Sequence, residues 1–143
     1  MERLEPFIGE WSVETSLAPP GEVVGRAVFE WMLGGQFMAQ RTEIPHPDAP
    51  DSLVITGRDD AGGAYTQHYF DSRGVVRVYA MTFSEGVWTL LRDTPDFSPL
   101  NFSQRFTGSF SDDGDTIDGR WETAHDGSTW ELDFELTYTR RLT

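Results

Sequence analysis

The chain lacks cysteine and lysine, and both absences narrow its chemistry. None of its 143 residues is cysteine, and all 11 basic residues are arginine. The missing thiols exclude disulfides, a cysteine nucleophile and zinc–thiolate or iron–sulfur sites. The missing lysine excludes a Schiff base and a phosphate-loop lysine. His46, His68 and His125 have none of the spacings typical of zinc ligands, so we expect no metal and no other cofactor.

Charge of one sign predominates. Asp and Glu number 24 against the 11 arginines, which gives a net charge of −13. Nucleic acids and anionic membrane surfaces are therefore excluded as expected partners, because both are bound through basic surfaces. The sequence has no apolar run of the roughly 18 residues that a membrane span needs, and its start does not resemble a secretory signal. We expect a cytoplasmic protein, either a monomer or a homodimer.

The last third of the chain alternates residue by residue between polar and apolar side chains. The period of two at 102–110, 117–123 and 130–140 predicts β-strands with one face toward water. Turns rich in Asp and Gly at 112–115 and 125–127 separate these strands, so we expect an antiparallel meander. The apolar face of the last strand is predicted to contain Trp130, Leu132, Phe134, Leu136 and Tyr138.

The same alternation upstream predicts further strands at 9–17, 22–33, 36–44, 52–59, 64–71, 74–84 and 86–93. The links between them are too short for helical crossovers, so sequential strands are expected to be antiparallel neighbours. A sheet of about ten strands leaves exposed edges unless it closes or splits in two. We therefore predict an all-β, closed or nearly closed up-and-down barrel forming one domain over 1–143, with a β-sandwich as the alternative.

The two ends of such a barrel differ in their links. Successive links alternate between the ends, and this places the two long, Pro-rich links, 45–50 and 94–99, at the same end. Binding loops tend to be the longer ones, so this end is the predicted mouth. The segment 4–8 then falls at the opposite end, where we expect a short N-terminal plug.

Gly9-x-Trp11 near the start of the chain and Arg140-Arg141 near its end form a further pair of features. Together they resemble the calycin group of barrels, which includes the lipocalins and fatty-acid-binding proteins, and the layout looks like an uncharacterised bacterial calycin-like family. The resemblance implies that one of the two arginines packs across Trp11 and closes the barrel. It also implies that the interior binds a small apolar or amphipathic molecule.

Six polar side chains are the candidates for contacting such a ligand: His68, Arg77, Tyr79, Arg92, Gln104 and Tyr138. Either alternate set of strand 74–84 can face inward. An inward Arg77 would stand beside Tyr79 and favour an amphipathic ligand, but the cost of burying an unpaired arginine favours the outward phase. Arg140, beside Tyr138, fits either an anion clamp or a cation–π closure of the barrel, and the resemblance favours the closure.

Three classes of function stay open on this sequence. The first is binding of a small ligand in the barrel. The second is a packed barrel that acts through its surface as a homodimer, for which Val24, Val28 and Met32 are predicted exposed apolar residues. The third is a cavity enzyme of isomerase or cyclase type that uses an interior residue such as His68. Haem binding, as in the nitrobindin barrels, is less favoured because the residues around the Gly-x-Trp do not extend that match.

Overall fold

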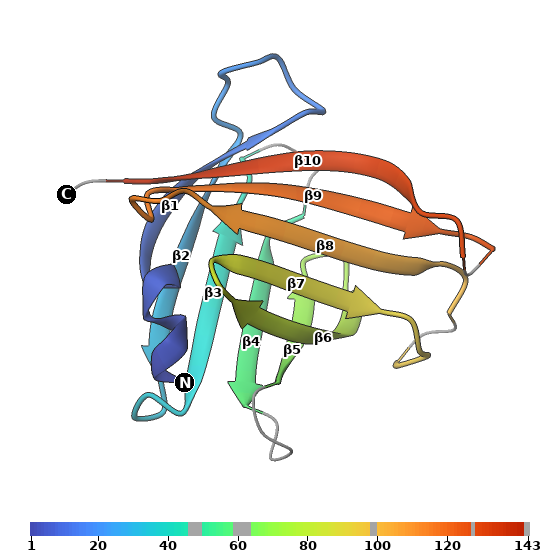
Figure 1. The fold of residues 1–143 in the computed structure, drawn as a ribbon, viewed down its shortest axis with the longest axis horizontal. Coiled ribbons are helices and arrows are strands. Elements are labelled where there is room, and N and C mark those ends of the chain that lie inside the picture. The colour runs from blue at the N-terminus through green and yellow to red at the C-terminus, as the bar shows by residue number, and fades with distance from the viewer. Residues whose placement is uncertain (46–49, 59–63, 98–99, 127, 142–143) are drawn as a thin grey trace.

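Ten antiparallel strands close into a barrel over the residues that the structure describes (Figure 1). The structure is a computed structural model describing residues 1–45, 50–58, 64–97, 100–126 and 128–141. Its elements are η1 (Glu2–Phe7), β1 (Gly9–Thr15), β2 (Gly25–Met32), β3 (Phe37–Glu43), β4 (Ser52–Arg58), β5 (Tyr65–Asp71), β6 (Val76–Ser84), β7 (Val87–Arg92), β8 (Ser103–Phe110), β9 (Thr116–Ala124) and β10 (Glu131–Arg140). Each strand pairs with its sequence neighbours, and β1 also pairs with β10. The predicted up-and-down barrel is confirmed, and the sandwich alternative is excluded.

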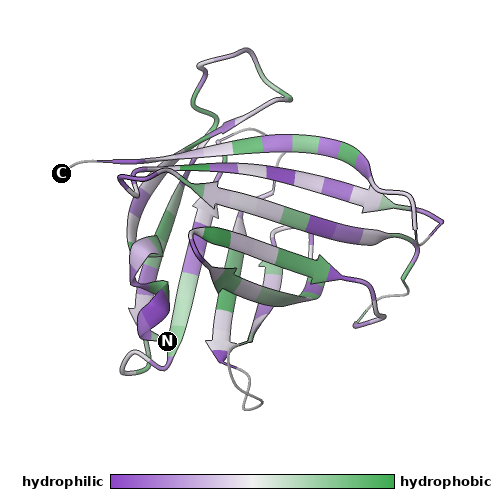
Figure 2. Cartoon of the chain, viewed as in Figure 1, coloured by the Kyte–Doolittle hydropathy of each residue, from purple (hydrophilic) through white to green (hydrophobic). Residues whose placement is uncertain are grey.

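The strands form because their side chains alternate between the interior and the surface. In β5, for example, Tyr65 and Gln67 are buried whereas His68 and Phe70 are exposed. Figure 2 shows the same alternation of polar and apolar residues along β9 and β10. No helix in the described part of the chain has the length and hydrophobicity that a membrane span requires.

The N-terminal helix η1 closes one end of the barrel, as predicted. Leu4 and Phe7 have no solvent exposure. The Phe7 ring makes edge contacts with Trp88 and Phe110, each at 5.0 Å between ring centroids. The Trp11 indole nitrogen donates a hydrogen bond to the Phe7 carbonyl oxygen at 2.9 Å. The plug is therefore joined both to the aromatic core and to the first strand.

Arg140 is the arginine that covers Trp11. Its guanidinium carbon lies 4.2 Å from the centroid of the Trp11 ring, and it donates to the Ile8 carbonyl oxygen at 2.8 Å. Gly9 makes this approach feasible, because it has φ +133° and a Cβ there would lie 2.9 Å from the Arg140 guanidinium. Arg141 is exposed and pairs with Glu10 at 3.2 Å. One arginine thus seals the seam between β1 and β10.

A bulge in β10 corrects one prediction. The register with β9 shifts between Leu132 and Phe134, and Leu132 is 51 % exposed instead of facing the core. A bulge adds one residue to one strand of a pair, so the side chains on its two sides differ in phase. Strict alternation across 130–140 was therefore the wrong expectation for Leu132.

Candidate ligand-binding site

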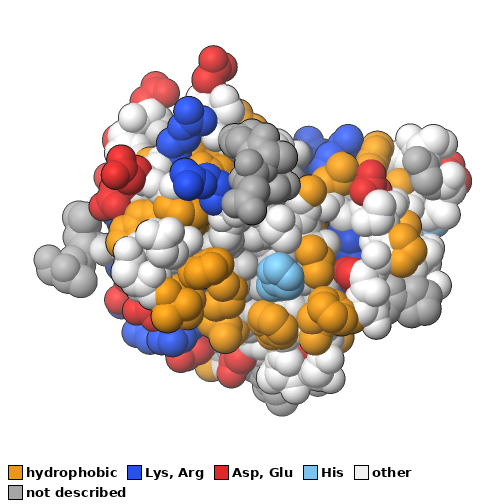
Figure 3. Space-filling model, turned by 90° about the horizontal axis from the view of Figure 1, so that it is seen from below, with side chains coloured by type: hydrophobic (Ala, Val, Ile, Leu, Met, Phe, Trp, Pro, Cys, Tyr) orange, Lys and Arg blue, Asp and Glu red, His pale blue; other side chains and the backbone are white. Residues whose placement is uncertain are grey.

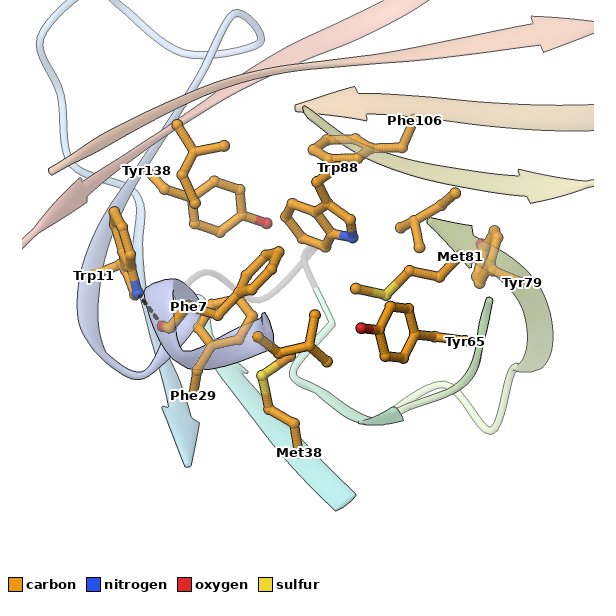
Figure 4. Packing of buried hydrophobic residues seen from close by; sticks show 14 of the residues in the cluster. Phe7, Trp11, Phe29, Met38, Tyr65, Tyr79, Met81, Trp88, Phe106 and Tyr138 are labelled. Atoms are coloured by element: carbon orange, nitrogen blue, oxygen red, sulfur yellow. Dashed lines mark hydrogen bonds between the residues drawn. The ribbon is translucent and has the colours of Figure 1, made fainter. Parts of the chain in front are cut away.

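Aromatic side chains fill the half of the barrel next to the plug (Figure 4). Trp88 packs against Phe106 at 4.7 Å and against Tyr138 at 6.2 Å between centroids. Tyr138, a predicted ligand contact, is buried in this cluster beside Phe29. Burial raises the pKa of Tyr138 to about 12, so the phenol stays protonated. Tyr138 is therefore surrounded by core residues.

Four other predicted residues lie on neighbouring strands toward the opposite end. Arg77 and Tyr79 come from β6, Arg92 from β7 and Gln104 from β8. The Gln104 side-chain oxygen accepts hydrogen bonds from the Arg77 guanidinium at 3.2 Å and from the Tyr79 hydroxyl at 3.3 Å. Arg92 stands directly across from Gln104 in the register of β7 and β8. These four residues, the mouth cluster, place two arginines beside a shared amide.

The outward phase expected for Arg77 is wrong. Tyr79 and Met81, on the same face of β6, are 3 % and 0 % exposed, so this set faces the interior. Arg77 itself is half-buried, at the second position of β6. Its guanidinium bonds to Gln104, which compensates for part of the desolvation that favoured the outward phase.

Arg92 has a counter-ion that the sequence pattern does not indicate. Asp96 accepts two hydrogen bonds from its guanidinium, at 2.8 and 3.0 Å, and the two side chains are only 4 % and 6 % exposed. Asp96 also accepts from the backbone N–H of Val78 at 3.0 Å. A carboxylate four residues beyond the end of a strand gives no periodic signal, so only the arginine was found. The pair fixes the link after β7 against β6.

A depression of about 490 Å³ opens at this end of the barrel. The links after β5 and β7 border it, together with inward residues of the strands that they join. Its walls are Arg73, Gly74, Val75, Val76, Arg77, Arg92, Phe97, Asn101 and Phe102. Asp71 neutralises Arg73 at 2.7 Å, and Asp96 neutralises Arg92. Arg77, by contrast, makes no ion pair with any carboxylate of the described residues.

The histidines do not join this cluster in the described structure. His68 is exposed on the outer face of β5, because its neighbour Gln67 takes the inward position, so its predicted interior place is wrong. His125 is exposed and lies 5.4 Å from the Phe102 ring. His46 lies outside the described residues. Within the described ranges, no three His, Asp or Glu side chains gather into a metal-binding group.

The outer face is apolar in places, but less so at the predicted positions. Val24, Val28 and Met32 are half-buried, and Val24 packs against the core. Leu53 and Phe70 are more exposed, at 37 % and 39 %, and they pair across β4 and β5. Figure 3 shows hydrophobic side chains beside a histidine on the face seen from below.

Comparison with known proteins supports the fold alone. No family model and no curated protein sequence matches this chain. Among solved structures, it is similar to the crystal structure of Rv2717c from M. tuberculosis, with a TM-score of 0.64 and 14 % sequence identity over 99 % of this chain and 96 % of that one. At this identity the likeness extends to the barrel and does not indicate a ligand.

Proposed function

We propose that this chain is a cytoplasmic, calycin-like barrel that binds a small amphipathic molecule with a carboxylate at one end. Arg77 supports this most directly. Its guanidinium borders the 490 Å³ depression, bonds to the neutral Gln104 and has no carboxylate partner among the described residues. A planar guanidinium matches a carboxylate with two parallel hydrogen bonds. The neighbouring Arg92 is already neutralised, which leaves Arg77 to bind the anion.

The residues next to Arg77 suit the rest of a carboxylate site. Burial raises the pKa of Tyr79, against the smaller opposite effect of Arg77, so its hydroxyl remains a donor. That hydroxyl and the Arg77 guanidinium share the single oxygen of Gln104. A carboxylate oxygen can replace Gln104 as their acceptor, and a charged acceptor makes the stronger bonds. Binding of a carboxylate thus replaces the neutral Gln104 acceptor with a charged one that forms stronger hydrogen bonds.

The core residues below the depression are apolar, which favours a ligand with a hydrocarbon part that inserts among them. Along β6 and β7, the inward side chains beyond the mouth cluster are Met81 and Leu90, 0 % and 3 % exposed. An alkyl chain that packs against these residues buries its apolar surface away from water. Each Å² buried in this way contributes about 25 cal/mol to the binding free energy. A carboxylate at the mouth with an alkyl chain pointing inward matches both environments.

Calorimetric titration with dodecanoate tests the proposal. We expect binding to the unmodified protein and weaker binding of dodecanol, which has the same chain without the charge. Arg77→Gln should lower dodecanoate affinity about tenfold or more, because a charge-assisted hydrogen bond contributes roughly 1.5–3 kcal/mol. Arg41→Gln is the matched control, since Arg41 pairs with Glu30 on the exposed outer face. Equal dodecanoate affinity in both variants, or no binding to the unmodified protein, would contradict the proposal.

A further inference from the structure

Trp88 is a buried hydrogen-bond donor without an acceptor. It is 2 % exposed, and its indole nitrogen has no partner among the described residues. The indole nitrogens of Trp11 and Trp31 both donate, to the Phe7 carbonyl oxygen at 2.9 Å and to Glu5 at 3.1 Å. Buried donors are nearly always paired in folded proteins, so the exception at Trp88 calls for an acceptor.

The Trp88 ring is held so that this donor faces the barrel interior. Phe106 at 4.7 Å and Phe7 at 5.0 Å both meet the indole edge to face. In Figure 4 the indole nitrogen points toward the interior next to Met81, and the hydroxyl of Tyr65 points into the same region from β5. Tyr65 is itself 4 % exposed. The two donors thus come from β5 and β7, the strands on either side of β6, and face one part of the interior.

A third polar group near Met81 has only a weak partner. Gln67 is 3 % exposed, and its side-chain nitrogen donates to the Met81 sulfur at 3.9 Å. A thioether is a poor acceptor, so the amide can donate to an oxygen instead. The Gln67 wall also includes Thr56, which lies directly across on β4 and is 1 % exposed. The interior around Met81 is therefore mainly apolar, but it also contains the hydrogen-bond donors of Trp88, Tyr65 and Gln67.

We propose that Trp88, with Tyr65, binds an oxygen atom at the inner end of the ligand. The inference rests on the proposed function, since the carboxylate of the same molecule lies at Arg77. Arg77 and Met81 are four residues apart on β6, which corresponds to about 13 Å at ~3.3 Å per residue. The ligand class is thus a medium-chain carboxylic acid that carries a hydroxyl or carbonyl oxygen at the far end of its chain.

Paired titrations with dodecanoate and ω-hydroxydodecanoate test this assignment. The unmodified protein should bind the hydroxy acid roughly three- to tenfold more tightly, the contribution of one hydrogen bond between neutral groups. Trp88→Phe keeps an aromatic ring and removes the N–H, so it should abolish the preference while retaining dodecanoate binding. Trp130→Phe is the control, because the Trp130 ring lies against Arg105 and is not part of the buried core cluster that contains Trp88. A preference that survives in Trp88→Phe overturns the assignment.

A second variant and an NMR measurement complete the test. If Trp88→Phe does not fold, Tyr65→Phe should reduce the same preference, and an unchanged preference there overturns the assignment. In the unmodified protein, the Trp88 indole N–H resonance should move on adding the hydroxy acid and less with dodecanoate; a resonance that stays fixed while the hydroxy acid binds indicates an internal water as its partner and also overturns it. Failure of dodecanoate itself to bind refutes the proposed function, whereas equal binding of the two acids refutes only this inference.

Discussion

Arg140 joins three parts of the chain through one guanidinium group. It donates to the carbonyl oxygens of Pro6 at 2.6 Å, Ile8 at 2.8 Å and Gly114 at 3.2 Å, while its face covers Trp11. These are the plug, the link before β1 and the turn between β8 and β9. A single side chain thus satisfies carbonyl groups that the adjacent strands leave without partners.

Removing that side chain should destabilise the barrel measurably. Arg140→Ala loses three hydrogen bonds, a cation–π contact and a partly exposed ion pair with Asp115 at 3.3 Å, and we expect a cost of about 2–3 kcal/mol. The thermal midpoint should fall by roughly 6–12 °C. Arg141→Ala is the control, because the Arg141 side chain interacts among the described residues only through an exposed ion pair with Glu10 at 3.2 Å, and exposed pairs contribute little. Equal midpoints for the two variants would contradict this account of the closure.

Asp71 should make the stability of the folded state depend on pH in the acid range. Burial acts to raise its pKa, but hydrogen bonds from Arg73, from Tyr69 and from the backbone N–H groups of Arg73 and Val75 outweigh burial and lower it from 3.8 to about 2. A lowered carboxyl pKa stabilises the folded state above the unfolded value, and this contribution is lost as pH falls through the folded value. The thermal midpoint should therefore fall between pH 3.8 and about 2 more steeply in the unmodified protein than in Asp71→Asn. Parallel curves for the two proteins would show that Asp71 is not responsible.

At the scale of elements, Asp96 connects the link after β7 to two strands. Asp96→Asn keeps the shape but leaves the buried Arg92 without a counter-charge, which should cost about 3 kcal/mol. The Val78 amide, which donates to Asp96, should then exchange its hydrogen faster with solvent. Asp93→Asn, at an exposed position in the same link, is the control. Unchanged exchange at Val78 would contradict the proposed anchoring.

The strands were predictable from sequence because each one buries a single face. Alternation located β8 and β9 within a residue or two. The resemblance to calycin barrels indicated Gly9, Trp11 and one of two arginines, and the structure selects Arg140. The phase of β6 was not predictable. Both of its faces contain valine or aromatic residues, and the deciding partner of Arg77 is Gln104, 27 residues further along the chain.

The remaining parts of the site depend on contacts that produce no periodic pattern in the sequence. Asp96 lies in an irregular link, so nothing in its sequence environment distinguishes it from the other carboxylates of an acidic chain. The unpaired nitrogen of Trp88 is a property of the assembled core, since the same residue type is satisfied at Trp11 by a nearby carbonyl oxygen. Sequence therefore predicted the barrel and named four residues of the mouth cluster as ligand-binding candidates, whereas three-dimensional packing brought them together, turned Arg77 inward and decided which of their charges and donors have partners.

At the scale of the whole molecule, the mouth differs from the rest of this acidic protein because arginines gather there. The chain has a net charge of −13, yet three of its arginines border one depression, and among them Arg77 has no acidic partner in the described structure. Remote carboxylates repel an anion over about 8 Å at physiological salt, so a bound carboxylate depends on short-range hydrogen bonds at the mouth. This arrangement favours a ligand whose apolar part adds to its affinity over one recognised by charge alone.

Native mass spectrometry of the freshly purified protein examines the whole molecule at once. If the barrel captures an endogenous amphipathic acid, the native mass should exceed the denatured mass by the mass of that molecule, and Arg77→Gln purified in parallel should retain less of it. The same spectrum reports the number of subunits, and a dimer would point to the apolar outer face around Leu53 and Phe70. A native mass equal to the bare chain or its dimer in both proteins, combined with no dodecanoate binding, would contradict a ligand-binding barrel. The exposed outer face would then be the surface on which this protein acts.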